Sequence, residues 1–260
     1  MGKIQPKKNL GQHFLKDKSI ALRVASSLTG TGYSSVLEIG PGSGILTGFL
    51  LERKFDDFRV IEIDNESVHY LRERFPGFTG IIRGDFLRMD IESYFDGKLA
   101  IIGNFPYNIS SQILFRVLEY RDKVMEVCGM FQKEVAERIC AAPGSKTYGI
   151  LSVLVQAFYA TEYLFTVPGH VFSPPPEVKS GVIRLIRNHV TVLGCDESLF
   201  FRVVKAAFNQ RRKTLRNSIK AAFQLKGEDY IDFGLRPEQL STEGFISLTN
   251  WIDKNRLLTE

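Results

Sequence analysis

The alternation of short apolar runs with amphipathic stretches constrains this fold more than any other feature of the sequence. Short apolar runs predict buried strands, and apolar residues spaced three or four apart predict helices. A repeated strand, helix, strand order requires a mostly parallel sheet with helices on both faces, and such a sheet binds ligands at the carboxyl ends of its strands. Strands are predicted at 36–39, 58–63, 78–82, 99–102, 124–131, 163–167 and 181–186, and helices at 17–28, 45–53, 66–75, 111–120, 133–140 and 150–159.

The chain changes character after Asn188. The last two predicted strands are joined by the loop Pro174-Pro-Pro176, which suits an antiparallel pair closing one edge of the sheet. Beyond Asn188 the apolar spacing is helical and continues to Trp251. We therefore predict a Rossmann-like α/β domain at 1–188 and a small helical domain at 189–260.

The charge of the chain is unevenly distributed. The formal charge of the 260 residues is +5, yet residues 1–23 carry +5 and residues 184–220 carry +7, so the remainder is acidic. Basic segments on an acidic body predict a surface for a polyanion, since each Lys or Arg that meets a phosphate releases a counterion. Two solvated basic faces are an equally weighted alternative.

Cysteine usage and hydropathy predict the compartment. Cys128, Cys140 and Cys195 have no C-x-x-C spacing and are too few for a disulfide framework, which favours a reducing compartment. The most apolar stretch, 150–165, is interrupted by polar residues and falls short of the roughly 20 residues that a membrane helix needs. We expect a cytoplasmic protein without a membrane segment, and no metal-ligand spacing is found among its histidines and cysteines.

A glycine-rich motif, Glu38-Ile-Gly-Pro-Gly42, follows the first predicted strand. Glycines at a strand-to-helix turn let the backbone approach a ligand closely, and the following helix presents free N–H groups. The motif fits the dinucleotide fingerprint at Gly40 and Gly42, but Ile45 stands at the third glycine position, which disfavours a nicotinamide oxidoreductase. A tight turn without a ligand is the alternative.

Two acids lie at or just after the ends of the next two predicted strands. Glu62 can accept hydrogen bonds from both hydroxyls of a ribose. Asp85 can accept a hydrogen bond from the exocyclic amino group of an adenine, with Phe86 or Ile63 packing on the ring. Asp64 competes with Glu62 for the ribose, and the alternatives without a ligand are a helix cap at Asp64 or Asn65 and an ordinary aspartate turn at Asp85. Each signal is weak alone, but their order along successive strand ends favours a nucleoside site.

The fourth such strand ends in Asn104, Phe105, Pro106 and Tyr107. An amide side chain, a proline that stiffens the turn and an aromatic ring offer hydrogen-bond acceptors beside a stacking surface. A flat base with an amino group could occupy that position. We therefore interpret this turn as the reaction centre.

These motifs together resemble the S-adenosylmethionine-dependent small-subunit rRNA adenine dimethyltransferases of the KsgA type. The resemblance covers nearly the whole chain. It rests on Asn9-Leu-Gly-Gln-His-Phe-Leu15, Glu38-Ile-Gly-Pro-Gly42, Val60-Ile-Glu-Ile-Asp64, Gly84-Asp85, Gly103-Asn-Phe-Pro-Tyr-Asn108, Val171-Phe-Ser-Pro-Pro-Pro176 and Asn209-Gln-Arg-Arg-Lys-Thr-Leu-Arg216. Many relatives have Asn where His13 stands and Leu where Phe105 stands.

The resemblance implies S-adenosylmethionine as co-substrate, with no metal. The residues implied to contact it or to line its pocket are His13, Leu15, Gly40, Glu62, Asp85 and Asn104, beside Gly42 and Phe86 in the same motifs. We hypothesise that the Asn104 side-chain carbonyl and the Phe105 backbone carbonyl accept the two hydrogens of the adenine amino group, which localises its lone pair for in-line methyl transfer. Pro106 fixes the turn, and Tyr107 would stack on the flipped adenine with Phe172 as a second face or as a core residue.

The basic segments would bind the RNA. We expect phosphate contacts from Arg211, Arg212, Lys213 and Arg216, over about two turns of helix, and from Lys7 and Lys8 in a segment that folds over the site. The resemblance implies dimethylation of two adjacent adenosines near the 3′ end of small-subunit (16S) rRNA, in the immature small ribosomal subunit. A monomer is our default expectation for the oligomeric state. The related macrolide-resistance methylases of large-subunit rRNA and a ribosome-assembly binding protein are the other candidates.

Overall fold

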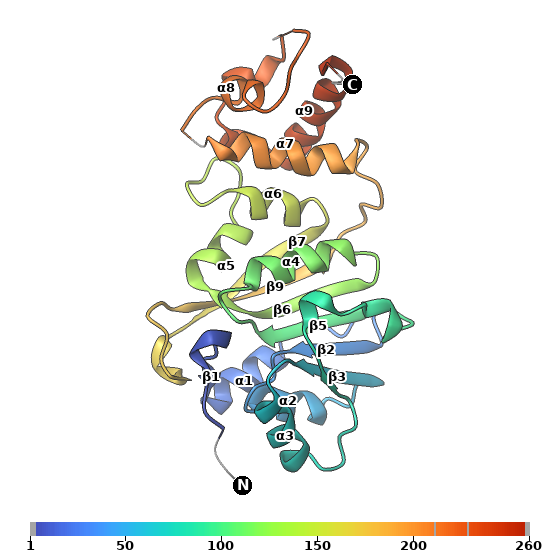
Figure 1. Ribbon diagram of the computed structural model, residues 1–260, viewed down its shortest axis with the longest axis vertical. Helices are drawn as coiled ribbons and strands as arrows, with labels where there is room; N and C mark the ends of the chain where they lie inside the picture. The colour runs from blue at the N-terminus through green and yellow to red at the C-terminus, as the bar shows by residue number, and fades with distance from the viewer. Residues whose placement is uncertain (1–3, 211, 228, 258–260) are drawn as a thin grey trace. The chain divides into compact units, whose positions relative to one another are not determined.

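Seven strands form one sheet in the order β4-β3-β2-β5-β6-β9-β7 (Figure 1). The computed structural model describes residues 4–210, 212–227 and 229–257. In spatial order the strands are β4 (Ile81–Arg83), β3 (Asp57–Glu62), β2 (Ser35–Ile39), β5 (Leu99–Asn104), β6 (Val124–Gln132), β9 (Ser180–Arg187) and β7 (Tyr159–Val167).

The first five strands of that order are parallel, and their ends lie level. Ile39 is paired with Ile61 on one side and with Gly103 on the other, while Glu62 is paired with Arg83. β9 runs antiparallel to β6 and lies beside β7 at one edge. The predicted Rossmann-like α/β sheet is therefore confirmed, with the chain leaving four neighbouring parallel strands at the same edge.

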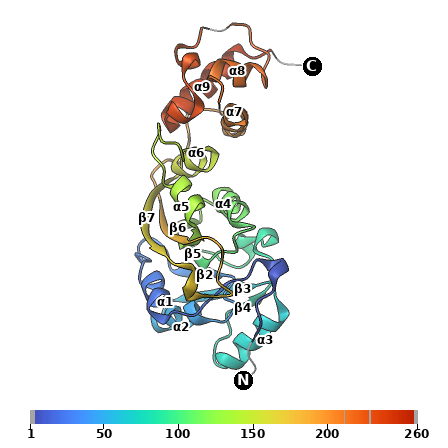
Figure 2. The same ribbon diagram turned by 90° about the vertical axis from the view of Figure 1, so that its left-hand side faces the viewer.

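Helices cover both faces of the parallel part of the sheet (Figure 2). On one face, α1 and α2 bury apolar side chains such as Val24 and Leu50 against Val36, Ile102 and Met130 of the strands. All five residues of β2 are buried, as expected for a strand that is covered on both faces. The helices are α1 (Lys18–Ala25), α2 (Ile45–Glu52), α3 (Asn65–Arg74), α4 (Ser110–Glu119), α5 (Lys133–Ile139), α6 (Ile150–Gln156), α7 (Glu197–Asn209), α8 (Leu215–Lys220) and α9 (Thr242–Asn255).

The chain divides into two compact units. One comprises the chain up to Ala136 together with Ala160–Arg187, and the other comprises Glu137–Tyr159 together with the chain from Asn188 onward. The sequence analysis placed 137–159 with the first domain. In the structure this stretch packs with the C-terminal helices, because α6 contacts α7 and α9 and the Gly144 N–H donates to the Glu238 carbonyl at 2.6 Å.

Several predicted boundaries differ from the structure, and one strand pair was not predicted. The strand expected at 78–82 begins only at Ile81, because Phe78 closes a turn and its ring stacks on Phe58 at 5.3 Å. The helix expected at 150–159 ends at Gln156, and β7 begins at Tyr159. A two-residue pair, β1 (Phe14–Leu15) with β8 (Phe172–Ser173), was not predicted. In the described part of the chain, no helix has both the length and the apolar character to cross a membrane.

Gly129 provides a test of how tightly β5 and β6 pack. A Cβ atom at this position would lie 2.6 Å from the Phe105 ring and would collide with the Gly103 carbonyl. We expect Gly129→Ala to lower the free energy of unfolding by about 1 to 3 kcal/mol, because overpacking forces neighbouring atoms apart. Urea denaturation measures the change. Gly77→Ala is the control, since a Cβ atom there meets nothing within 4 Å, and equal stability of the two variants would contradict the packing argument.

Candidate active site

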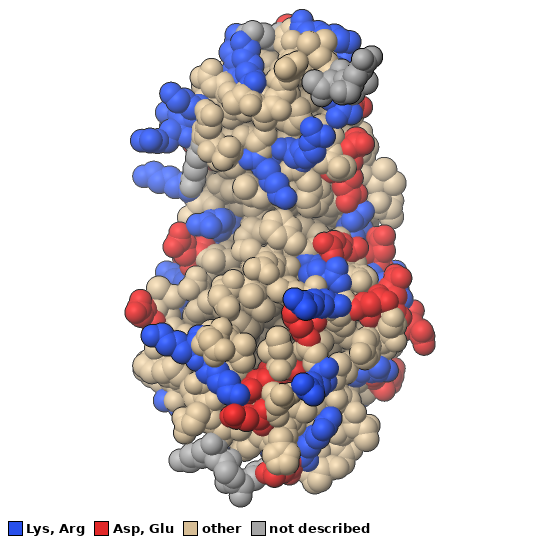
Figure 3. Space-filling view, in the orientation of Figure 1, with Lys and Arg blue, Asp and Glu red and all other residues tan. Residues whose placement is uncertain are grey.

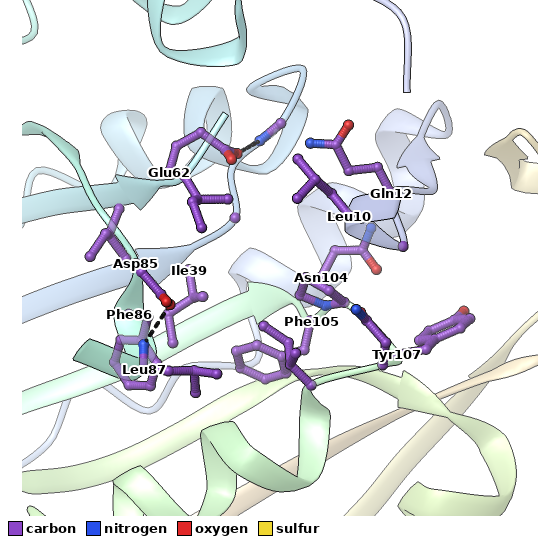
Figure 4. Close-up of a pocket in the computed structure, with 18 of the residues that line it drawn as sticks. Leu10, Gln12, Ile39, Glu62, Asp85, Phe86, Leu87, Asn104, Phe105 and Tyr107 are labelled. Carbon is purple, nitrogen blue, oxygen red and sulfur yellow. Dashed lines mark hydrogen bonds between the residues drawn. The ribbon is translucent and has the colours of Figure 1, made fainter. Parts of the chain in front are cut away.

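The four level strand ends open onto one cavity of about 190 Å³. Figure 4 shows Glu62 and Asp85 on one side of this cavity and Asn104 and Tyr107 on the other. The segment 9–14, from the beginning of the chain, completes the wall. Among the residues predicted for the site, the cavity lining includes His13, Gly40, Gly42, Glu62, Asp85, Phe86, Asn104, Phe105, Pro106 and Tyr107.

The glycine turn and Glu62 form one hydrogen-bonded unit. Gly42 has a positive φ of 50°, and a Cβ atom there would lie 2.8 Å from the Phe14 ring. Its N–H donates to Glu62 Oε2 at 3.1 Å, and the Asp64 N–H donates to Glu62 Oε1 at 2.9 Å. Each carboxylate oxygen keeps a further lone pair. Burial raises the pKa of Glu62, and these backbone donors oppose the increase.

A second carboxyl group, Glu38, lies beneath the same turn. It is fully buried at the end of β2, and the Thr47 hydroxyl donates to its Oε2 at 2.7 Å. Burial, reinforced by the nearby charge of Glu62, raises the pKa of Glu38 to about 8. The sequence analysis quoted Glu38 within a motif but assigned it no role. A carboxylate inside an otherwise apolar strand was the signal that could have identified it.

Asp85 caps the turn after β4. Its Oδ1 accepts from the Leu87 N–H at 2.9 Å, at the start of the short 3-10 helix Phe86–Arg88. Arg88 Nε lies 3.7 Å from the other carboxylate oxygen. Phe86 is buried and still contributes to the cavity lining. The aspartate-turn interpretation is therefore confirmed as local structure, and the side chain also borders the cavity.

Asn104 is oriented by the backbone of His13. Its Nδ2 donates to the His13 carbonyl at 2.8 Å. Because a carbonyl oxygen can only accept, this bond assigns the amide nitrogen to that side and leaves Oδ1 as an acceptor on the other. The sequence analysis considered His13 for a contact with the co-substrate and missed this orienting role.

Phe105 anchors the turn below Asn104. Its ring is buried, packs on Phe131 with centroids 4.9 Å apart, and lies over Gly103 and Gly129. Its N–H donates to the Met130 carbonyl at 3.2 Å. Among the described residues, none donates a hydrogen bond to the Phe105 carbonyl. That oxygen is an acceptor in the same turn as Asn104 Oδ1.

Tyr107 is held in place from two sides. Its hydroxyl is 2.6 Å from Ser180 Oγ on β9, and its ring stacks on His13 with centroids 5.6 Å apart and planes 28° apart. The His13 ring in turn donates from Nδ1 to the Pro174 carbonyl at 2.8 Å. Burial raises the pKa of Tyr107, although its hydrogen bond with Ser180 opposes the increase.

Leu15 and Phe172 lie outside the cavity lining. They are partners in the β1–β8 pair, and both are buried in the core beside α1 and α2. The suggestion that Phe172 forms a second face for a base is therefore corrected in favour of its alternative, a core residue. Phe14, which was not predicted, lines the cavity between them and the glycine turn.

The basic residues also differ from expectation. Lys7 is paired with Asp64 and Glu66, whereas Lys8 is exposed, and the assignment of both residues to RNA stays a prediction. Arg212 and Lys213 are exposed in a turn between α7 and α8, rather than on a helix, because Gln210 has non-helical angles and Thr214, directly before α8, has extended angles. Arg216 is exposed on α8, and Arg211 lies outside the described residues. Lys and Arg side chains predominate over the α8 end of the second unit (Figure 3).

The family model described as ribosomal RNA adenine dimethylase matches residues 4–254. The chain belongs to this family. Ribosomal RNA adenine dimethylases are S-adenosylmethionine-dependent methyltransferases, so the predicted enzyme class and co-substrate are confirmed. A relative from Flavobacterium johnsoniae, ribosomal RNA small subunit methyltransferase A, is 59% identical over 256 residues, which cover 97% of this chain and 98% of the relative. The protein of the same name from Cytophaga hutchinsonii is 57% identical over 255 residues, covering 97% and 99%.

Solved structures share the fold of this chain. A dimethyladenosine transferase from Plasmodium falciparum superposes with a TM-score of 0.79 at 23% identity, over 95% of this chain and 100% of that chain. The 23S rRNA methyltransferase ErmE superposes with a TM-score of 0.66 at 24% identity, over 92% and 99%. These similarities show the methyltransferase sheet, and the arrangement of the strand ends described above is consistent with it.

The buried Glu38 makes a prediction about pH. Its pKa is raised from an ordinary value of 4.5 to about 8, so the folded state binds more protons than the unfolded state between these values, and stability falls as pH rises through that window. Glu38→Gln cannot ionise. We expect its stability relative to the wild type to increase from pH 5 to pH 9 by about 4 kcal/mol, at about 1.4 kcal/mol per pKa unit over the part of the shift that lies in this range. Urea denaturation at each pH measures this, and a constant difference would contradict the buried neutral acid.

Proposed function

We propose that this protein transfers methyl groups from S-adenosylmethionine to the exocyclic amino groups of two adjacent adenosines near the 3′ end of small-subunit rRNA, and that its substrate is the immature small ribosomal subunit. The observation that carries the proposal is the orientation of Asn104, whose amide nitrogen is bonded to the His13 carbonyl. Its Oδ1 and the Phe105 carbonyl are therefore two acceptors in one turn of the cavity. The relatives named ribosomal RNA small subunit methyltransferase A support the choice of subunit.

The side of the cavity that holds Glu62 and Asp85 suits the co-substrate. Glu62 keeps two lone pairs for ribose hydroxyls, and Asp85 borders the cavity as an acceptor for an adenine amino group. The glycine turn at Gly40 and Gly42 leaves room for close backbone approach. Phe86 and the half-exposed Ile63 supply apolar surface for the adenine ring.

The opposite side suits the target base. An adenine amino group is a weak nucleophile because its lone pair is delocalised into the ring. Acceptance of both amino hydrogens by Asn104 Oδ1 and the Phe105 carbonyl favours a pyramidal nitrogen whose lone pair faces the sulfonium methyl. The new N–C bond forms as the S–C bond breaks, and the amine then loses a proton to solvent. Tyr107, fixed by Ser180, offers its ring for stacking with the flipped base.

The exposed cations of the second unit suit the RNA backbone. Arg212 and Lys213 extend from the turn between α7 and α8, and Arg216 follows on α8. We assign them, with Lys8 in the first unit, to phosphate contacts that position the RNA without reading its sequence.

Asn104→Ala tests the reaction centre. We expect a loss of at least about 100-fold in kcat, because one transition-state acceptor is removed, while the affinity for S-adenosylmethionine remains measurable. Methylation of immature small subunits with labelled S-adenosylmethionine measures the rate. Asn250→Ala is the matched control. It removes a comparable hydrogen bond within the second unit, from the Asn250 side-chain amide to the Gly194 carbonyl at 3.0 Å. Near-normal turnover by the Asn104 variant would reject the mechanism.

The double substitution Arg212→Ala and Lys213→Ala tests the RNA assignment. We expect weaker RNA binding and a plot of log affinity against log salt that is shallower by about one for each phosphate that the protein no longer neutralises. Filter binding of an rRNA fragment at several salt concentrations measures both. Lys254→Ala, an exposed lysine on α9, is the control. An unchanged slope in the double variant would refute the assignment.

A further inference from the structure

The segment 9–14 forms one wall of the cavity although it precedes the sheet in sequence. The C-terminal end of this wall, which we call the far end, is held by several hydrogen bonds, and the end that adjoins Lys7 is called the near end. Phe14 and Leu15 pair with β8, and the His13 carbonyl accepts from Asn104. The near end of the wall therefore decides whether the segment stays against the cavity.

Lys7 closes the near end through its backbone. Its carbonyl accepts from the Leu10 N–H at 3.1 Å and from the Gln12 N–H at 3.4 Å, and its own N–H donates to Gln12 Oε1 at 2.8 Å. These three bonds fold residues 7–12 into one turn. Any displacement of Lys7 is consequently passed to the residues that line the cavity.

The side chain of Lys7 ties this turn to the sheet. Its Nζ lies 2.5 Å from Asp64 Oδ1 and 3.2 Å from Glu66 Oε1 at the start of α3. The Asp64 side chain is only 4% exposed and also accepts from the N–H and hydroxyl of Ser67. Because the Asp64 N–H donates to Glu62 Oε1, a continuous series of bonds joins the wall to the carboxylate assigned to the ribose.

The Lys7 contact is also the part of the wall that solvent can weaken. Its side chain is 33% exposed, whereas the β1–β8 end is bound by a backbone ladder and by buried apolar side chains. An ion pair at such a position is screened by salt and contributes modestly, but it can be broken and remade without unfolding anything else.

We propose that Lys7 is a positioning residue for the co-substrate: its ion pair with Asp64 holds the wall 9–14 against the cavity, and opening of this contact sets the rate at which S-adenosylmethionine and its demethylated product leave. The inference rests on the function proposed above, since it concerns the same cavity. It replaces the expectation that Lys7 meets an RNA phosphate. Release of both molecules is consequently faster at high salt.

The test compares Lys7→Met, which keeps the apolar stem and removes the charge, with Lys7→Arg, which keeps the charge. Lys18→Met is the matched control, an exposed lysine at the start of α1 outside the wall. The full-length protein is loaded with labelled S-adenosylmethionine and chased with an excess of unlabelled compound at low and high salt. Amide hydrogen exchange of residues 9–14 in the ligand-free protein reports opening of the wall independently of any activity.

We expect release from Lys7→Met to be about fivefold faster than from the wild type and nearly independent of salt, with faster amide exchange at Leu10 and Gln12. Lys7→Arg should restore most of the wild-type rate, and Lys18→Met should match the wild type. With saturating S-adenosylmethionine, kcat of Lys7→Met should stay within about twofold of the wild type, so that the change appears in KM. This split distinguishes a positioning role from general damage.

Equal release rates in Lys7→Met and the wild type would overturn the inference, and so would faster amide exchange without faster release. Unchanged release combined with weaker RNA binding would overturn it in favour of an RNA contact. For each of these outcomes, the proposed function still holds if the wild type binds S-adenosylmethionine and methylates small-subunit rRNA. A wild type that does neither overturns both proposals.

Discussion

The level ends of four parallel strands are the constraint on which the rest of this structure depends. Ile39 lies opposite Ile61 and Gly103, so the chain turns away from β2, β3 and β5 at one edge, and β4 ends beside them. Strands buried on both faces leave no other place for polar chemistry. Residues far apart in sequence therefore meet at this edge. The topology creates the cavity, and the residues at or just after the end of each strand determine its chemistry.

Most of the fold could be predicted from local patterns. The apolar runs predicted β2, β3, β5 and β6 within a residue or two, because turns with glycine or polar residues bound each run. The strand predicted to begin at Phe78 begins later, because Phe78 lies in a turn and its ring packs on Phe58. Neither the β1–β8 pair nor the packing of 137–159 with the C-terminal helices has a local signal. Both depend on contacts between distant segments.

The site divides in the same way. Glu62, Asp85 and Asn104 could be predicted because each stands where a strand must end, and the cavity includes all three. The partner of a long charged side chain could not be predicted, because a lysine pairs with a phosphate or with a carboxylate according to which one the fold places nearby. In the structure, Lys7 pairs with Asp64. Phe172 likewise entered the core because its two-residue strand pairs beside α1.

The buried Glu38 changes the electrical state of the whole molecule. The formal charge of +5 counts every glutamate as ionised, but a carboxyl group with a pKa of about 8 is mostly neutral at pH 7. The folded protein is therefore nearly one charge more positive than its composition indicates. At neutral pH this proton is carried by the native state alone, and it returns to the solvent when the chain unfolds. Calorimetric unfolding enthalpies will accordingly differ between buffers by the heat of protonating the buffer.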